Sequence, residues 1–152
     1  MYYNNCMIVV RTPTTREEFK TYYTLRYQVL REPLGLPRGT EKDDYEPIAQ
    51  HLIAMDDETK EIAGVIKYSQ NEPCDCRFSH LAVKDAYQGK GIGKLLVDTV
   101  EKKAREKGMK CIGTLSRLSA MPFYEKLGYK KKGEVQKIFD TLDMIWMEKP
   151  LT

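Results

Sequence analysis

At residues 88–94 the chain reads Gln88-Gly89-Lys90-Gly91-Ile92-Gly93-Lys94. Three glycines within five residues let the backbone take up positive φ and approach an anion closely. An apolar segment precedes this turn and an amphipathic segment follows it. The pattern predicts a strand, an anion-binding turn and a helix, because the first amides of a helix have no intrahelical partner.

The segment after the turn has the periodicity of a helix. Ile92, Leu95, Leu96 and Val100 recur at helical spacing, while charged side chains fill the positions between them. Gly108 follows a basic stretch and predicts the end of this helix. We therefore expect one amphipathic helix between the turn and Gly108.

Two other phosphate-binding motifs fail on the same residues. A P-loop needs a second glycine where Lys94 stands, followed by Lys and Ser or Thr, and Leu95 and Leu96 offer no hydroxyl for magnesium. A dinucleotide fingerprint also needs its third glycine at the position of Lys94. The turn therefore belongs to a different class of phosphate site.

The spacing that fits is Gln-x-x-Gly-x-Gly, present as Gln88, Gly91 and Gly93 directly after a predicted strand. In this motif the chain resembles the GCN5-related N-acetyltransferase (GNAT) superfamily, in which the turn's amides hold the pyrophosphate of coenzyme A. The resemblance implies acetyl-CoA as co-substrate. The implied cofactor-binding residues in this part of the chain are Leu81, Ala82, Val83, Gln88, Gly89, Lys90, Gly91, Ile92, Gly93 and Lys94.

A second motif of the same family lies farther along the chain. The form Ala-x-x-x-Tyr-x-x-x-Gly-Phe is matched by Ala120, Tyr124 and Gly128, with Tyr129 in place of the phenylalanine. The resemblance implies that Phe123 and Tyr124 lie near the cofactor and that Tyr124 is the general acid. A phenol with an ordinary pKa of about 10 can supply a proton at neutral pH. Tyr124 could equally serve only to pack the short helix.

One residue departs from the family pattern. Arg117 stands where many members have an asparagine that binds the pantetheine. A guanidinium can only donate hydrogen bonds, so the role of the amide is not transferred to it. Arg117 could meet a phosphate or a carboxylate, or it could be a solvated loop cation.

The general base is less well defined by the sequence. His80 lies on the strand that leads into the turn, and a histidine side chain titrates near physiological pH. It is our candidate, although a strand histidine can be purely structural. Glu72, Asp75 and His51 are alternatives, and a water molecule could relay the proton.

The remaining pattern predicts one α/β domain over residues 1–152. Short apolar segments bounded by polar turns indicate strands, and Thr15 with Glu18 forms a possible capping box before a helix that ends near Arg31. We expect a central mixed, mostly antiparallel sheet flanked by helices on both faces, which the family resemblance also implies. The expected strands are 7–10, 52–55, 62–68, 77–83, 109–113, 129–135 and 143–149, and a short helix is expected at 119–126.

Composition limits the partners. A net charge of +3 is too small to indicate nucleic acid, and no apolar run is long enough to span a membrane. The four cysteines lack the spacing of a zinc site, so we expect no metal, reduced thiols and a cytoplasmic location. Those cysteines are Cys6, Cys74, Cys76 and Cys111.

These observations predict an N-acetyltransferase that moves an acetyl group from acetyl-CoA to a primary amine by direct attack in a ternary complex. The acceptor, a small molecule or a peptide, is undefined. Within the connection 31–47, the acids Glu41, Asp43, Asp44 and Glu46 could attract a cationic amine or form an ordinary polar surface. The alternative function is a non-catalytic acyl-CoA sensor or interaction module. The resemblance also allows a homodimer.

Overall fold

The computed structural model describes residues 2–3 and 6–151, and residues 1, 4–5 and 152 lie outside the described part, as do the side chains of Tyr2, Tyr3 and Cys6. The chain forms two units, one of residues 1–69 and 80–100 and the other of residues 70–79 and 101–152. Strand β5 (Cys76–Val83) and helix α2 (Ile92–Glu106) contribute residues to both units. The prediction of a single domain over residues 1–152 includes the residues outside the described part and stays a prediction.

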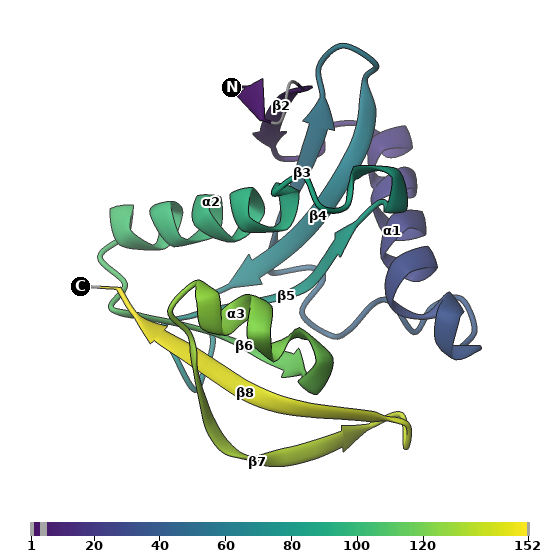
Figure 1. Cartoon of the computed structure of the whole chain (residues 1–152). Coiled ribbons are helices and arrows are strands. Elements are labelled where there is room, and N and C mark those ends of the chain that lie inside the picture. Colours follow the sequence, from purple (N-terminus) through teal and green to yellow (C-terminus); the bar gives the residue numbers. More distant parts are fainter. Residues whose placement is uncertain (1, 4–5, 152) are drawn as a thin grey trace. The chain divides into compact units, whose positions relative to one another are not determined.

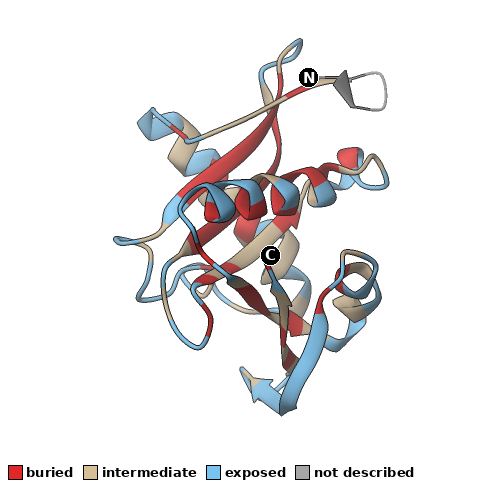
Figure 2. Cartoon of the chain, turned by 90° about the vertical axis from the view of Figure 1, so that its left-hand side faces the viewer, coloured by how far each residue is buried: buried red, intermediate tan, exposed pale blue. Residues whose placement is uncertain are grey.

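The first unit is built on an antiparallel meander (Figure 1). Successive strands pair β1 with β2, β2 with β3 and β3 with β4. Nearly every residue of β3 and β4 is buried, as Figure 2 shows in red. Strands that are apolar on both sides must be covered on both faces. The four strands are β1 (Tyr2–Tyr3), β2 (Cys6–Arg11), β3 (Gln50–Asp56) and β4 (Glu61–Ser69).

Helices cover both faces of this sheet. Helix α1 (Arg16–Leu30) packs Tyr22 and Leu25 into a cluster that includes Val65 of β4. A Cβ atom on Gly64, the preceding residue, would lie 3.0 Å from Ile92 at the start of α2. Because successive strand residues point to opposite faces, α1 and the start of α2 lie on opposite sides of β4.

The start of α1 is capped by side chains. The Thr15 hydroxyl accepts a hydrogen bond from the Glu18 amide at 3.0 Å, as the sequence predicts. The Glu18 carboxylate instead accepts from the Thr14 amide at 2.8 Å and binds Arg11 at 2.9 Å. Only half of the predicted capping box therefore forms, because Arg11 on β2 draws the carboxylate away from the Thr15 amide.

The second unit combines parallel and antiparallel pairing. The start of β5 pairs in parallel with β6 (Cys111–Arg117) at two positions. Strand β8 (Leu142–Pro150) pairs antiparallel with both β6 and β7 (Lys130–Ile138). Strand β7 is almost wholly exposed (Figure 2). The 3-10 helix η3 (Leu118–Ala120) leads into helix α3 (Met121–Lys126).

The predicted fold class, a mixed and mostly antiparallel sheet flanked by helices, is confirmed. All seven expected strands form, although the strand expected at 109–113 is shifted to Cys111–Arg117. The Met109 amide donates to Ala104 at 3.0 Å and closes α2, and the Lys110 amide donates to Asp75 at 2.8 Å. In the described part of the chain, no helix is long and apolar enough to cross a membrane.

Candidate functional site

The glycine-rich turn follows the 3-10 helix η2 (Asp85–Tyr87) and runs into α2. Gly89 and Gly91 have φ of +75° and +81°, values that residues with a side chain rarely adopt. Helical hydrogen bonding starts where the Leu95 amide donates to the Gly91 carbonyl at 3.0 Å. Among the described residues, none accepts a hydrogen bond from the five amides of residues 89–93. These amides stay available at the positive end of α2.

Tyr87 anchors the turn to the strands of the first unit. Its hydroxyl lies 3.0 Å from an Asp56 carboxylate oxygen and 3.1 Å from one of Glu61. Burial, reinforced by these two carboxylates, raises the pKa of Tyr87 to about 12, so the hydroxyl stays a donor. The Gln88 side chain donates to the Val83 carbonyl at 3.2 Å and fixes the entry to the turn. The motif spacing gave no indication of Tyr87 beyond its place next to Gln88.

The end of β5 carries the predicted strand residues. His80 has a φ of +56°, so the strand bends at this position. Ala82 is buried in the core, whereas Leu81 and Val83 are only partly buried. The Lys84 amide donates to the Ala63 carbonyl at 2.8 Å and ties this end of the segment to β4. The structure thus places the predicted residues 80–94 in one unit, on consecutive elements.

The environment of His80 favours the neutral imidazole. Burial lowers its pKa well below the ordinary value of 6.5, and the positive charges of Arg26, Lys67 and Arg31 lower it further. Glu46 opposes this effect only in part. The neutral ring can accept a proton at pH 7, as a general base must.

The other candidate bases either make structural hydrogen bonds or are exposed to solvent. His51 has both ring nitrogens engaged, Nδ1 at 2.7 Å from the Tyr22 hydroxyl and Nε2 at 3.0 Å from the Glu46 carbonyl. Since a carbonyl only accepts, Nε2 carries the proton and Nδ1 accepts from Tyr22. Asp75 accepts from the Lys110 amide at 2.8 Å, and Glu72 is exposed before β5. His80 is therefore the best-placed of the four candidates.

Tyr124 lies in the second unit, in α3. Its ring is 7% exposed and packs among Phe78, Phe123 and Tyr129, with ring centroids 5.0 to 5.8 Å away. Its hydroxyl has no hydrogen-bond partner within the described part of the chain, and it is not one of the fully buried unpaired atoms. Burial raises the pKa of Tyr124, so the phenol keeps its proton at neutral pH.

The neighbouring Tyr129 differs from Tyr124 because its hydroxyl has a hydrogen-bond partner. That hydroxyl donates to a Glu101 carboxylate oxygen at 2.7 Å, and Glu101 also binds the Lys149 ammonium at 3.1 Å. Glu101 is buried, so this contact satisfies a charge that would otherwise be costly. Tyr129 thus has a structural partner, whereas the Tyr124 hydroxyl has none among the described residues.

Arg117 is the last residue of β6 and is partly buried, so it is not a loop cation. Desolvation lowers the pKa of its guanidinium. A cation held partly out of water gains more from an anionic ligand than an exposed one does. This position is compatible with the phosphate or carboxylate contact weighed from the sequence.

The expectation that all cysteines are reduced is wrong. Cys74 and Cys111 form a disulfide with a Cα–Cα distance of 5.4 Å across 37 positions. Their meeting follows from the parallel pairing of β5 with β6, which sets Cys76 opposite Ile112. Cys76 is a buried thiol, and burial raises its pKa to about 12. Glu148 lies near the disulfide, but sulfurs joined to each other are not thiolate metal ligands.

Most of the acids in the connection after α1 are paired or buried within the protein. Glu46 binds Arg26 at 2.8 Å and Lys67 at 2.6 Å, and Asp43 also pairs with Lys67. Glu41 is buried, and its backbone carbonyl accepts from Arg26. Because Asp43 and Glu46 pair with internal cations and Glu41 is buried, only Asp44 of these four acids is exposed without an ion pair among the described residues. These contacts weaken the case for the cation-attracting surface considered from the sequence.

Known proteins support the family. The family model described as an acetyltransferase (GNAT) domain matches residues 38–151, well over half of the chain. The uncharacterized N-acetyltransferase YitI of Bacillus subtilis (strain 168) is 28% identical over 74% of this chain and 78% of its own length.

Solved structures show the same fold. An acyl-CoA N-acyltransferase from Pseudomonas aeruginosa has a TM-score of 0.79 at 16% identity, covering 95% of this chain and 99% of that one. An aminoglycoside 6'-N-acetyltransferase complexed with coenzyme A has a TM-score of 0.76 at 18% identity, covering 95% and 97%. The chain is therefore a member of the acetyltransferase (GNAT) family, which confirms the family, the fold and the class of enzyme, an N-acetyltransferase, predicted from its sequence.

Proposed function

We propose that this protein transfers an acetyl group from acetyl-CoA to a primary amine by direct attack in a ternary complex. The observation that carries the proposal is the set of open amides at residues 89–93, aimed from a positive-φ turn at the start of α2. Such an array suits a pyrophosphate, because several donors and the helix dipole act on one spot. The solved relative bound to coenzyme A supports the choice of cofactor.

The chain would hold the cofactor along two elements. The amides of residues 89–93 would bind the pyrophosphate, with Gln88 and Tyr87 keeping the turn in shape. The main chain of Leu81, Ala82 and Val83 would receive the pantetheine like an added strand. This use of the main chain is compatible with the burial of Ala82, because its side chain packs in the core while its backbone groups would bind the pantetheine.

Two protons must move for the transfer to complete. Acetyl-CoA supplies an activated thioester, so the amine nitrogen bonds to the carbonyl carbon and the carbon–sulfur bond breaks. His80, neutral at pH 7, would take the proton from the amine directly or through water. Tyr124 would give its proton to the departing sulfur. Its raised pKa means that the phenol is protonated at neutral pH.

The proposal is tested by thiol release from acetyl-CoA across a panel of small amines, amino acids, aminoglycosides and peptides, with no-acceptor controls. Amine-dependent release, with the acetylated amine found by mass spectrometry, supports transfer. Tight binding of acetyl-CoA without turnover on any amine would favour the non-catalytic sensor. Failure to bind acetyl-CoA at all would contradict both functions.

The sequence-based predictions on partners and location belong with this proposal. We propose a small-molecule or peptide amine as acceptor, no nucleic-acid, membrane or metal partner, a cytoplasmic location and the option of a homodimer. The pairing of Asp43 and Glu46 with internal cations weakens the sequence argument that the connection attracts a cationic amine. Size-exclusion chromatography with light scattering decides the oligomeric state.

A further inference from the structure

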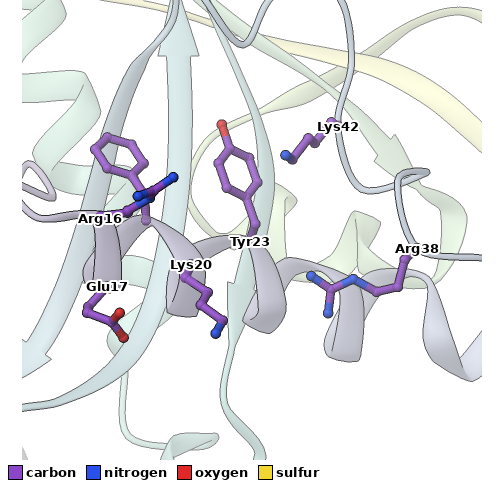
Figure 3. Close-up of a pocket in the computed structure, with 7 residues that line it drawn as sticks. Arg16, Glu17, Lys20, Tyr23, Arg38 and Lys42 are labelled. Carbon is purple, nitrogen blue, oxygen red and sulfur yellow. The ribbon is translucent and has the colours of Figure 1, made fainter.

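A pocket of about 510 Å³ opens along α1 and the connection that follows it (Figure 3). It lies wholly within the first unit and includes none of the residues assigned above to the cofactor or to proton transfer. Small-molecule sites in proteins span roughly 300 to 1,000 Å³. The pocket therefore has the volume of a small-molecule site.

Positive charge dominates its walls. Arg16 and Lys20 come from α1 and Arg38 and Lys42 from the connection, against the single acid Glu17. Arg38 lies 4.0 Å from Glu41, the outer limit of an ion pair. For Arg16, Lys20 and Lys42 the described residues provide no ion-pair partner. The pocket thus keeps an excess of positive charge that the protein does not itself neutralise.

The remaining walls are aromatic and fixed in place. The rings of Phe19 and Tyr23 are stacked, with centroids 6.5 Å apart and planes 27° from parallel. Figure 3 shows Lys42 reaching toward Tyr23, whose ring centroid is 4.3 Å from the Lys42 ammonium. The Tyr23 hydroxyl donates to Glu46 at 3.2 Å, and the buried Arg26 guanidinium lies 5.0 Å from the ring. The Tyr23 ring is therefore held by contacts with several neighbouring side chains.

We propose that this pocket binds a small organic anion that carries at least two negative charges and a flat apolar part. The two lysines and two arginines would bind carboxylate or phosphate oxygens through charge-assisted hydrogen bonds. Phe19 and Tyr23 would pack against the flat part. A cationic ligand is disfavoured, because Glu17 alone would have to offset four positive side chains.

Phenyl phosphate is a suitable probe, with inorganic phosphate as the probe of charge alone. Each is titrated at pH 7.5 into ¹⁵N-labelled protein, and amide resonances are followed by NMR. The expected result is saturable shifts at residues 16–23 and 38–42, with phenyl phosphate binding more tightly than phosphate. Shifts at residues 89–93 would report the separate turn, so this readout does not depend on the proposed acetyl transfer.

A charge-removing pair of substitutions locates the site. Lys20→Gln with Lys42→Gln should weaken phenyl phosphate binding about tenfold or more, since each lysine contributes a charge-assisted hydrogen bond to the anion. Both lysines are exposed, so the fold should survive. The matched control is Lys126→Gln with Lys131→Gln, two exposed lysines outside the pocket that remove the same charge. This control should leave the affinity unchanged.

Three results would overturn the inference. The first is shifts that do not saturate or that are confined to residues 89–93. The second is equal affinity in the Lys20/Lys42 variant and the wild type, or an equal loss in the control. The third is equal binding of phosphate and phenyl phosphate, which would refute the role of the aromatic surface.

Discussion

At the scale of single residues, Tyr124 and Tyr129 form a natural pair for separating chemistry from structure. The Tyr124 hydroxyl has no partner among the described residues, whereas the Tyr129 hydroxyl binds the buried Glu101 at 2.7 Å. Tyr124→Phe should therefore lower kcat about a hundredfold, the usual effect of losing a general acid, with little change in stability. Thiol release and urea denaturation measure the two effects.

Tyr129→Phe is the matched control for that substitution. It should lower the free energy of unfolding by about 1 to 3 kcal/mol, because a buried carboxylate loses a donor. Its turnover per folded molecule should change little. If Tyr124→Phe retained full kcat, the general acid would have to be water or another group, and Tyr124 would be a packing residue.

Because the pKa of His80 is lowered in the folded protein, we expect the free energy of unfolding to depend on pH. Its pKa in the folded protein lies well below 6.5, the ordinary value expected in the unfolded chain, because of burial and of the nearby Arg26 and Lys67. Below pH 6.5 the unfolded chain takes up a proton that the folded protein does not, so the free energy of unfolding falls as the pH drops. The fall can reach about 1.4 kcal/mol per pH unit for one group.

Urea denaturation at pH 7.5 and 5.5 tests this linkage. His80→Asn should reduce the loss of stability between the two pH values by about 1 kcal/mol, and asparagine tolerates the positive φ. The buried His51 also has a lowered pKa and contributes in both proteins, so the difference between them isolates His80. Parallel pH curves would show that burial does not hold down the pKa of His80.

At the scale of elements, glycines near the two ends of α2 allow a matched comparison. Gly89 and Gly108 share a φ of +75°, and neither has an atom within 4 Å of an added Cβ. Alanine at either position should cost about 1 to 2 kcal/mol of stability through backbone strain alone. Only Gly89→Ala also displaces amides that we assign to the pyrophosphate, so it should weaken coenzyme A binding at least tenfold. Calorimetric titration would contradict the assignment if both variants bound equally.

The sequence predicted the helices and strands more successfully than any other feature. The period of the apolar residues gave α2, and Gly108 with its φ of +75° ends it as expected. The shift of β6 to Cys111 was not foreseeable, because it depends on Asp75, far away in the sequence, accepting from the Lys110 amide. Local patterns predict local structure, and they do not show which distant group takes a given amide.

In the candidate site, too, local motifs were predictable from the sequence and contacts between distant segments were not. The spacing of Gln88, Gly91 and Gly93 marked the turn, but it could not indicate that Tyr87 is held by Asp56 and Glu61. It also could not indicate that Arg26 and Lys67 pair with Glu46 and lie near enough to His80 to lower its pKa. These contacts join segments that only the sheet brings together.

At the scale of the whole chain, the disulfide between Cys74 and Cys111 predicts a stability that depends on redox conditions. It closes a loop across 37 positions, which restricts the unfolded chain and should contribute about 4 kcal/mol to the free energy of unfolding. Urea denaturation with and without dithiothreitol should show this difference. Cys111→Ser should unfold like the reduced protein and be insensitive to dithiothreitol.

Counting reactive thiols tests whether the effect of dithiothreitol comes from the Cys74–Cys111 disulfide. The chain has four cysteines, so denatured, unreduced protein should show two reactive thiols and reduced protein four. In the folded protein Cys76 should stay unreactive, because burial raises its pKa to about 12 and leaves almost no thiolate at neutral pH. Cys76→Ser then serves as the control, since it removes a thiol outside the loop closure and should keep the dependence on dithiothreitol. Four thiols without reduction, or identical unfolding in both conditions, would mean that the two cysteines are neighbours but not bonded.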